Sequence, residues 1–205
     1  LGIKDKWDMV GSDAGITPVQ WGTALSYVKR VSRNARLKYT QFNYLHQTYL
    51  TPHRLHAIFP TVSAKCPRCA CEDADFLHMV WQCADLEQRW EQVMGIIADI
   101  TTTQLPVTPL VCLLGTTKHT KKNKFSLRFA NLAMVLFKKL IAMNWKAASP
   151  PTVYEWLRDV HKWASAEADF LTNILKQKGG DTLTTPWDTY LIKIRTHLEK
   201  DGVRG

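Results

Sequence analysis

Four of the five cysteines of this 205-residue chain lie with one histidine in a single short stretch, KCPRCACEDADFLHMVWQC. Cys66 and Cys69 form a C-x2-C pair, and the Pro-Arg turn between them can direct both thiolates toward one point. His78 follows after eight intervening residues, and Cys83 after four more. Three thiolates and one imidazole complete a tetrahedral ligand set for a structural Zn2+ and leave no position for a catalytic water. The spacing therefore predicts a closed zinc site at these four residues.

This ligand set has alternatives. Cys71 could replace Cys69 in a C-x4-C pair or could be a bystander, and the whole cluster could be a group of buried thiols without a metal. The fifth cysteine, Cys112, lies in the apolar run PLVCLLG, which favours a place in the core. An odd number of crowded cysteines is not typical of a secreted disulfide scaffold, so we expect an intracellular, reducing compartment.

The chain as a whole is predicted to be mainly α, a helical domain with a small embedded Cys-Cys-His-Cys (CCHC) zinc knuckle. Helix starts are indicated at Thr17, Pro52, Thr152 and Pro186, and helix ends at Pro150-Pro151 and Gly179-Gly180. Within the knuckle, Asp73 or Asp75 can cap a helix that carries His78 and ends just before Cys83. The only strand-like segment is LPVTPLVCLL.

Apolar residues recur at helical spacing in five segments, which is typical of helices packed on a core. These stripes are Trp21, Leu25 and Val28; Phe42, Leu45 and Tyr49; Leu86, Trp90, Val93 and Ile97; Phe125, Phe129, Leu132, Leu136 and Leu140; and Val153, Trp156, Val160, Trp163, Phe170 and Ile174. The eight tryptophans are interpreted mainly as packing residues. We divide the chain into an N-terminal helical segment, 1–60, the knuckle with its following helix, 61–100, and a C-terminal helical segment, 101–205.

The composition favours an anionic partner. Lys and Arg number 27 against 18 Asp and Glu, which gives a net charge of +9, and nucleic acid is the commonest partner of such a chain. No apolar run is long enough to predict a membrane span. The chain begins with Leu1 rather than Met, so we expect that it is cut from a longer chain.

Three basic clusters are candidate nucleic-acid contacts, although each could instead be a solvated surface. Lys29, Arg33 and Arg36 would share a polar face with Thr40, Asn43 and Gln47 if one helix ran through Ser32, whereas a helix cap at Ser32 would break that face. The second cluster lies in a predicted loop and consists of Lys118, Lys121, Lys122 and Lys124. The third cluster, Lys65 and Arg68, lies on the knuckle turn, where a bound metal would fix the direction of Arg68. Trp81 could stack on a base or pack beneath the metal site.

Several blocks of the sequence, taken in order, resemble a known family. They are YTQFNYLHQTYLTPHRLHAIFP, CPRCACEDADFLHMVWQC with LEQRWEQV, PLVCLLG followed by a Lys-rich loop and a helix with WK, PPTVYEWL, and PWDTYL. In this order they are similar to the C-terminal segment of LINE-type (non-LTR) retrotransposon reverse transcriptase polyproteins, over about residues 17 to 195. The family's variable cysteine spacing leaves the choice between Cys69 and Cys71 open.

The resemblance implies a zinc knuckle in a helical domain that helps to bind template RNA or target DNA, in the cytoplasm and nucleus. The rest of the parent reverse transcriptase would be a further partner, and no small-molecule substrate is implied. The chain contains no paired Asp-Asp motif and no Gly-rich phosphate loop, so we expect it to be non-catalytic. A zinc-stabilised protein-interaction module is the alternative. A catalytic zinc is disfavoured by the closed ligand set.

Overall fold

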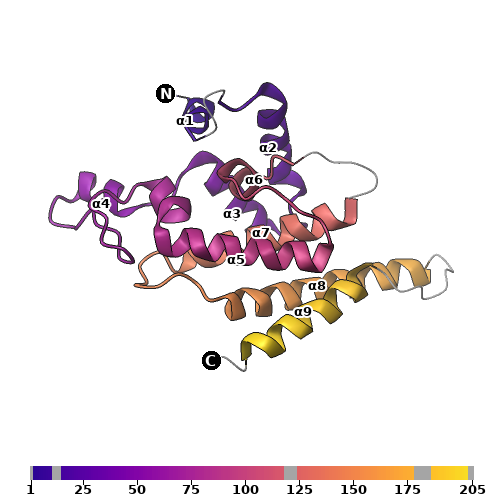
Figure 1. Cartoon of the computed structure of the whole chain (residues 1–205). Helices are drawn as coiled ribbons and strands as arrows, with labels where there is room; N and C mark the ends of the chain where they lie inside the picture. Colours follow the sequence, from indigo (N-terminus) through magenta and orange to yellow (C-terminus); the bar gives the residue numbers. More distant parts are fainter. Residues whose placement is uncertain (1, 11–14, 118–123, 178–185, 203–205) are drawn as a thin grey trace.

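The computed structural model describes residues 2–10, 15–117, 124–177 and 186–202, and none of these residues forms a strand (Figure 1). The predicted mainly α fold is therefore confirmed. The elements in order are α1 (Ile3–Asp8), α2 (Pro18–Arg30), α3 (Ala35–His46), α4 (Pro52–Ile58), the π-helical turn η1 (His78–Gln82), α5 (Ala84–Thr101), α6 (Pro109–Leu114), α7 (Lys124–Met143), α8 (Val153–Gln177) and α9 (Pro186–Gly202).

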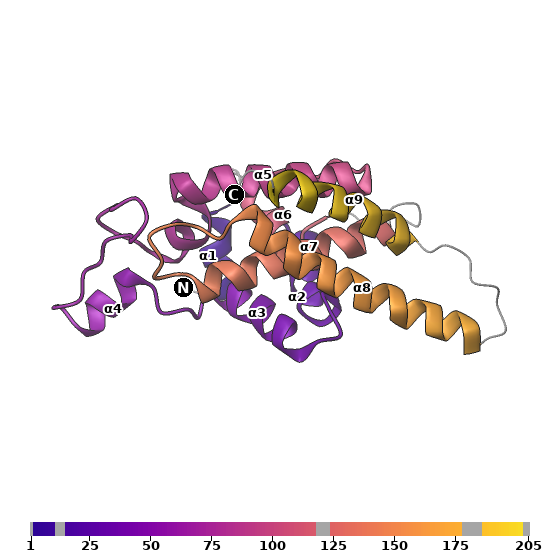
Figure 2. The same cartoon turned by 90° about the horizontal axis from the view of Figure 1, so that it is seen from below.

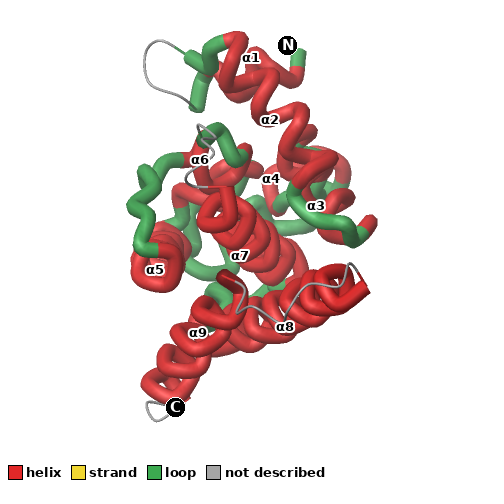
Figure 3. The backbone as a smooth tube through the Cα atoms, turned by 90° about the vertical axis from the view of Figure 1, so that its right-hand side faces the viewer, coloured by secondary structure: helices red, strands yellow, loops and turns green. Residues whose placement is uncertain are grey.

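Helix α7 forms the centre of the molecule and packs against α3, α5, α6 and α8 (Figure 3). Its apolar residues are buried around most of its circumference. Phe137 meets Trp90 of α5 edge-on, with ring centroids 4.7 Å apart, and the indole N–H of Trp156 of α8 donates to the carbonyl of Ala133 at 2.9 Å. Residues of all three predicted segments thus share one hydrophobic core, and the segment boundaries stay a prediction.

Two parts of the molecule extend from this body (Figures 1 and 2). Helices α8 and α9 run antiparallel along one side, and the C-terminal half of α8 extends beyond the body. At the other end lies the part that we call the knuckle lobe, residues 51–75, which contains α4 and the loop that follows it. Among the described residues, no helix has both the length and the apolar character needed to cross a membrane.

The helix starts follow from local capping. The side chain of Thr17 accepts a hydrogen bond from the N–H of Gln20, whose side chain accepts in return from the N–H of Thr17. Thr152 and Glu155 make the same reciprocal pair at the start of α8. Thr51 caps α4, directly before Pro52. Each cap satisfies N–H groups that have no partner inside the helix, so the starts predicted from the sequence are confirmed.

The expectation that LPVTPLVCLL could form a strand is wrong, because the second half of this segment forms α6. The hydroxyl of Thr108 accepts from the N–H of Val111, and Pro109 occupies the first turn. Val111 to Leu114, the last four residues of the run, are all buried, and an apolar stretch that is buried on every side has no period that separates a helix from a strand. Cys112 is fully buried, as predicted. Gly115 ends the helix at φ 66°, and a Cβ there would lie 2.6 Å from the Tyr27 ring.

Some members of the predicted apolar stripes are not buried. Leu25, Phe42, Phe125 and Phe170 are 41–46% exposed. Phe125 lies in the first turn of α7, and Phe170 lies in the C-terminal half of α8, where the guanidinium of Arg33 stacks on its ring. Periodicity identifies the face of a helix but not where its neighbour ends, so stripes drawn to the full length of a helix include exposed residues.

Candidate metal centre and nucleic-acid interface

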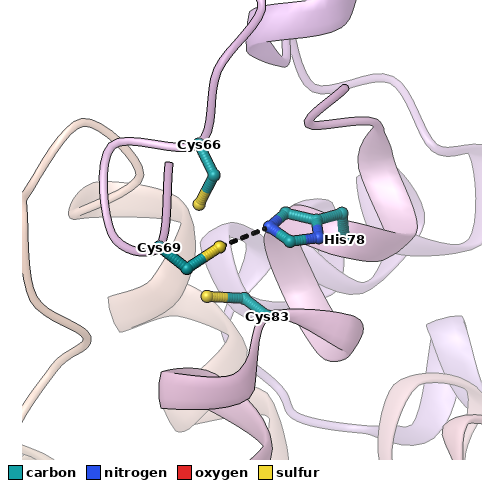
Figure 4. Close-up of side chains that lie close together, drawn as sticks. All are labelled: Cys66, Cys69, His78 and Cys83. Atoms are coloured by element: carbon teal, nitrogen blue, oxygen red, sulfur yellow. Dashed lines mark hydrogen bonds between the residues drawn. The ribbon is translucent and has the colours of Figure 1, made fainter. Parts of the chain in front are cut away.

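Cys66, Cys69, His78 and Cys83 converge on one point (Figure 4). Their ligand atoms all lie within 4.8 Å of one another, and Cys69 Sγ is 3.3 Å from His78 Nε2. In a tetrahedral site with Zn–S bonds of about 2.3 Å, the sulfurs would be roughly 3.8 Å apart, so the cluster has the dimensions of a metal site. These four residues could therefore hold a metal ion.

The first two ligands are presented by a tight turn. The N–H of Ala70 donates to the carbonyl of Cys66 at 2.9 Å, and the N–H of Cys66 donates to the carbonyl of Cys71 at 2.8 Å. The chain reverses at Ala70, which has a positive φ of 57°. This reversal leaves Cys71 exposed on the returning arm and outside the cluster. The structure thus groups Cys69, rather than Cys71, with the other three residues.

The last two ligands are joined by a π-helical turn. Asp75 Oδ1 accepts from the N–H of His78 at 2.7 Å, which identifies Asp75 as the cap that the sequence left open. The N–H of Cys83 donates to the carbonyl of His78, a bond that spans five residues. In an α-helix, residues five apart point about 140° away from each other. The wider turn, followed by the extended backbone of Cys83, lets both side chains face the cluster.

Two side chains donate hydrogen bonds to backbone carbonyls of this turn. Arg68 Nη1 donates to the carbonyl of Met79 at 3.0 Å, and Trp90 Nε1 donates to the carbonyl of Val80 at 3.0 Å. The remaining guanidinium atoms Nε and Nη2 of Arg68 are buried and have no partner. Arg68 therefore holds this turn, and its contact with nucleic acid stays a prediction. Trp81 is partly buried and packs on Trp90, with ring centroids 5.7 Å apart, so the packing alternative applies.

The electrostatics of the cluster suit a cation. Burial alone would raise the pKa of Cys66, but backbone N–H groups of Cys69 and Arg68 that point at its sulfur lower the pKa below its ordinary value. Burial, with Cys66 and Cys83 close by, raises the pKa of Cys69 to about 11. Burial also lowers the pKa of His78, which favours the neutral imidazole that metals bind. A cation between the sulfurs would favour their thiolate forms.

The first basic cluster does not lie on one helix face. Helix α2 ends at Arg30 and α3 begins at Ala35, so the predicted continuous helix is broken as the alternative expected. The cap is Asn34 rather than Ser32, because the Asn34 side chain accepts from the N–H groups of Arg36 and Leu37. Lys29, Arg33 and Arg36 are exposed, whereas the three polar residues that were to share their face are buried. These residues are Thr40, Asn43 and Gln47.

The other two clusters are only partly visible. Lys124 is exposed in the first turn of α7, while Lys118, Lys121 and Lys122 lie outside the described residues. Lys65 is exposed and forms an ion pair with Glu72 at 2.8 Å. A contact of these lysines with nucleic acid stays a prediction.

The structure also groups cations that the sequence did not. Lys29 and Arg33 line a hollow of about 340 Å3 together with Arg30, Lys38 and Arg128. Arg128 belongs to α7, about 100 residues away along the chain, so neither spacing nor composition could have placed it there. Arg36, by contrast, does not line the hollow.

A second feature that sequence reasoning missed is a lysine in the core. Lys138 of α7 is fully buried, and its ammonium group donates to Gln41 Oε1 and to the carbonyl of Leu113 at 3.0 Å. It also lies 5.1 Å from the ring centre of Tyr27. Burial lowers the pKa of Lys138 to about 7. A lysine inside an apolar stripe is the only sequence signal, and it does not distinguish a buried ammonium from an exposed one.

No known protein-family model matches the chain. The two places whose chemistry bears on function are the four-residue Cys/His cluster and the basic hollow.

Proposed function

We propose that Cys66, Cys69, His78 and Cys83 bind one structural zinc as a CCHC knuckle. The observation that supports this most directly is that one turn and one π-helical turn bring all four ligand atoms within 4.8 Å. Thiolate and imidazole together select zinc among the common divalent ions, and four protein ligands leave no position for a substrate or a catalytic water. The metal would hold the knuckle lobe in place, because few of its side chains are buried.

We infer further that the chain is a non-catalytic nucleic-acid-binding domain from the C-terminal part of a non-LTR retrotransposon reverse transcriptase. It would bind template RNA, target DNA or both during retrotransposition, in the cytoplasm and nucleus. The support is the order of sequence blocks, the net charge of +9 and the exposed cations around the α2–α3 corner. The chemistry of polymerisation and strand cleavage would belong to other parts of the parent polyprotein.

A separate observation favours a second candidate function, that of a protein-interaction module. A groove of about 590 Å3 runs beside α3 and the start of the knuckle lobe, with Tyr39, Phe42, Tyr49 and Trp145 in its walls. Tyr39 and Leu50 in this lining are 66% and 54% exposed. Large apolar side chains grouped at a surface are typical of binding sites for other proteins, and the rest of the parent reverse transcriptase would be such a partner.

Two measurements on the intact chain test these proposals. Elemental analysis of protein purified without a chelator should return one zinc per chain, and a metal-free preparation that stays folded in the lobe would overturn the zinc site. Binding to single-stranded RNA should weaken with salt, with a log–log slope of about −3 if four or five phosphates are contacted. Binding to protein but not to RNA at low salt would favour the interaction module.

A further inference from the structure

Five cationic side chains surround the hollow at the α2–α3 corner, and they come from three separate parts of the fold. Helix α2 and the corner contribute Lys29, Arg30 and Arg33, α3 contributes Lys38, and α7 contributes Arg128. The only acidic group in the described lining is Glu167 of α8. The described lining of this hollow of about 340 Å3 thus carries five cationic side chains and one carboxylate.

The arginines of the hollow are held in position. The guanidinium of Arg33 lies 3.8 Å from the centre of the Phe170 ring, which is a cation–π contact. Arg30 donates to the hydroxyl of Ser26, one turn earlier in α2. Arg128 forms an ion pair with Glu167. Side chains that are already ordered lose less conformational entropy when they contact a ligand.

The lysines of the hollow differ from its arginines. Neither Lys29 nor Lys38 makes a hydrogen bond or an ion pair with any residue that the structure describes. A buried donor in the same lining is also unsatisfied, because Trp187 is 1% exposed and its indole N–H has no acceptor. Unpartnered buried donors are rare in folded proteins, so the lining offers more donors than the protein itself uses.

We propose that this hollow is a phosphate-binding site, and that the phosphate belongs to the backbone of a bound nucleic acid. That the phosphate belongs to a nucleic acid rests on the proposed function. The cationic lining of the hollow by itself indicates only a phosphate group. Arginine and lysine are complementary here, because arginine presents a planar fork to phosphate oxygens and lysine a mobile point charge. The site accepts the phosphate and not the base, so it anchors nucleic acid without reading sequence.

The experiment compares two double variants with equal loss of charge in the intact, zinc-loaded chain. Lys29→Gln with Lys38→Gln removes the two free lysines, and Lys162→Gln with Lys176→Gln removes two exposed lysines of α8 that do not line the hollow. Affinity for a single-stranded RNA oligonucleotide is measured from about 50 to 200 mM salt. The hollow variant should bind roughly tenfold more weakly with a salt slope flatter by about 1.4, and the α8 variant should change less than about twofold.

A third variant guards against loss of folding as the explanation. Glu167→Gln removes the one carboxylate and frees Arg128, so RNA affinity should rise severalfold, which a damaged fold would not produce. Equal effects of the two lysine pairs, or no gain from Glu167→Gln, would overturn the site while leaving the proposed RNA binding intact.

If the wild-type chain binds no RNA, the proposed function fails. Binding of inorganic phosphate then tests separately whether the hollow is a phosphate-binding site. At constant ionic strength, phosphate in place of chloride should raise the Tm of the wild type and of the α8 variant but not of the hollow variant. An equal response of all three proteins would overturn the inference as well.

Discussion

In the body of the molecule, Trp90, Phe137 and Trp156 meet around α7 and are fully buried, whereas in the knuckle lobe most side chains of residues 53–73 face solvent. A few backbone hydrogen bonds connect parts of the lobe, such as the one from the N–H of Ala74 to the carbonyl of Ala64. The four residues of the Cys/His cluster also converge there. Burial of large apolar side chains stabilises the body, and a short segment without such burial needs another source of free energy.

The contrast shows that one region of the chain is built on a hydrophobic core, whereas the other contributes to a cluster of four residues that could hold a metal ion. Trp90 connects the two regions, because its ring packs on Phe137 in the body while its N–H holds the π turn that presents His78 and Cys83. Cys66 and Cys69 of the lobe thus meet His78 and Cys83, which flank a turn that Trp90 holds against the body.

The largest expected effect is loss of the metal. Structural zinc contributes apparent free energies of about 10–16 kcal/mol in small domains, so chelation should unfold the lobe. Hydrogen exchange should accelerate across residues 60–83 and stay slow in α7 and α8. Cys69→Ser should abolish zinc binding, and Cys71→Ser, two residues away, is the matched control that should retain it. Uniform acceleration over the whole chain would show that lobe and body are not separable.

The body should respond to a change in packing and not to chelation. Trp156→Ala removes a fully buried ring and its hydrogen bond to Ala133, and should lower the free energy of unfolding by about 3–5 kcal/mol. Urea denaturation with zinc present measures the loss, and zinc content should remain at one per chain. Trp163→Ala, on the same helix but only partly buried, should cost clearly less. Equal losses would contradict the assignment of the core.

The buried lysine predicts a pH dependence of the body. The pKa of Lys138 is about 7 when folded and about 10.5 when unfolded, so from pH 7 to 9 the unfolded state binds more protons and stability rises with pH. The rise should be about 2 kcal/mol. Above pH 9 the pKa of Cys112, raised by burial to about 12, acts in the opposite direction and should flatten the curve. Lys138→Met should remove the rise, measured by urea denaturation of the zinc-loaded protein; an unchanged rise would assign it to other groups.

The smallest expected effect concerns the knuckle turn. Ala70 has φ 57°, a conformation that costs an L-residue about 1 kcal/mol and glycine almost nothing. Ala70→Gly should therefore tighten zinc binding about fivefold, measured by competition with a chelator. Ala57→Gly, inside α4 of the same lobe, should weaken it slightly because glycine destabilises a helix. A loss of affinity in Ala70→Gly would mean that the turn is not strained.

What the sequence could predict was encoded within a few residues. Helix starts were predictable because a cap acts on backbone N–H groups a few residues away, as at Thr17 with Pro18 and at Thr152 with Glu155. The Cys/His cluster was predictable because the C-x2-C turn is also a local pattern. The apolar stripes predicted a helical fold for the same reason, because the helix period is a local property. The sequence left the choice between Cys69 and Cys71 open, and it offered Ser32 as a cap where the structure uses Asn34.

The tertiary structure decided whatever depends on residues that are distant in the chain. It turned Arg68 inward to the carbonyl of Met79 and buried Lys138 against Gln41. It also brought Arg128 beside Lys29 in one hollow. No local signal predicts these contacts, since each arises from the way whole helices pack on α7. The sequence alone determined that four ligands and a set of helices would form, and packing determined which cations meet, because side chains far apart in the chain become neighbours only when the core closes.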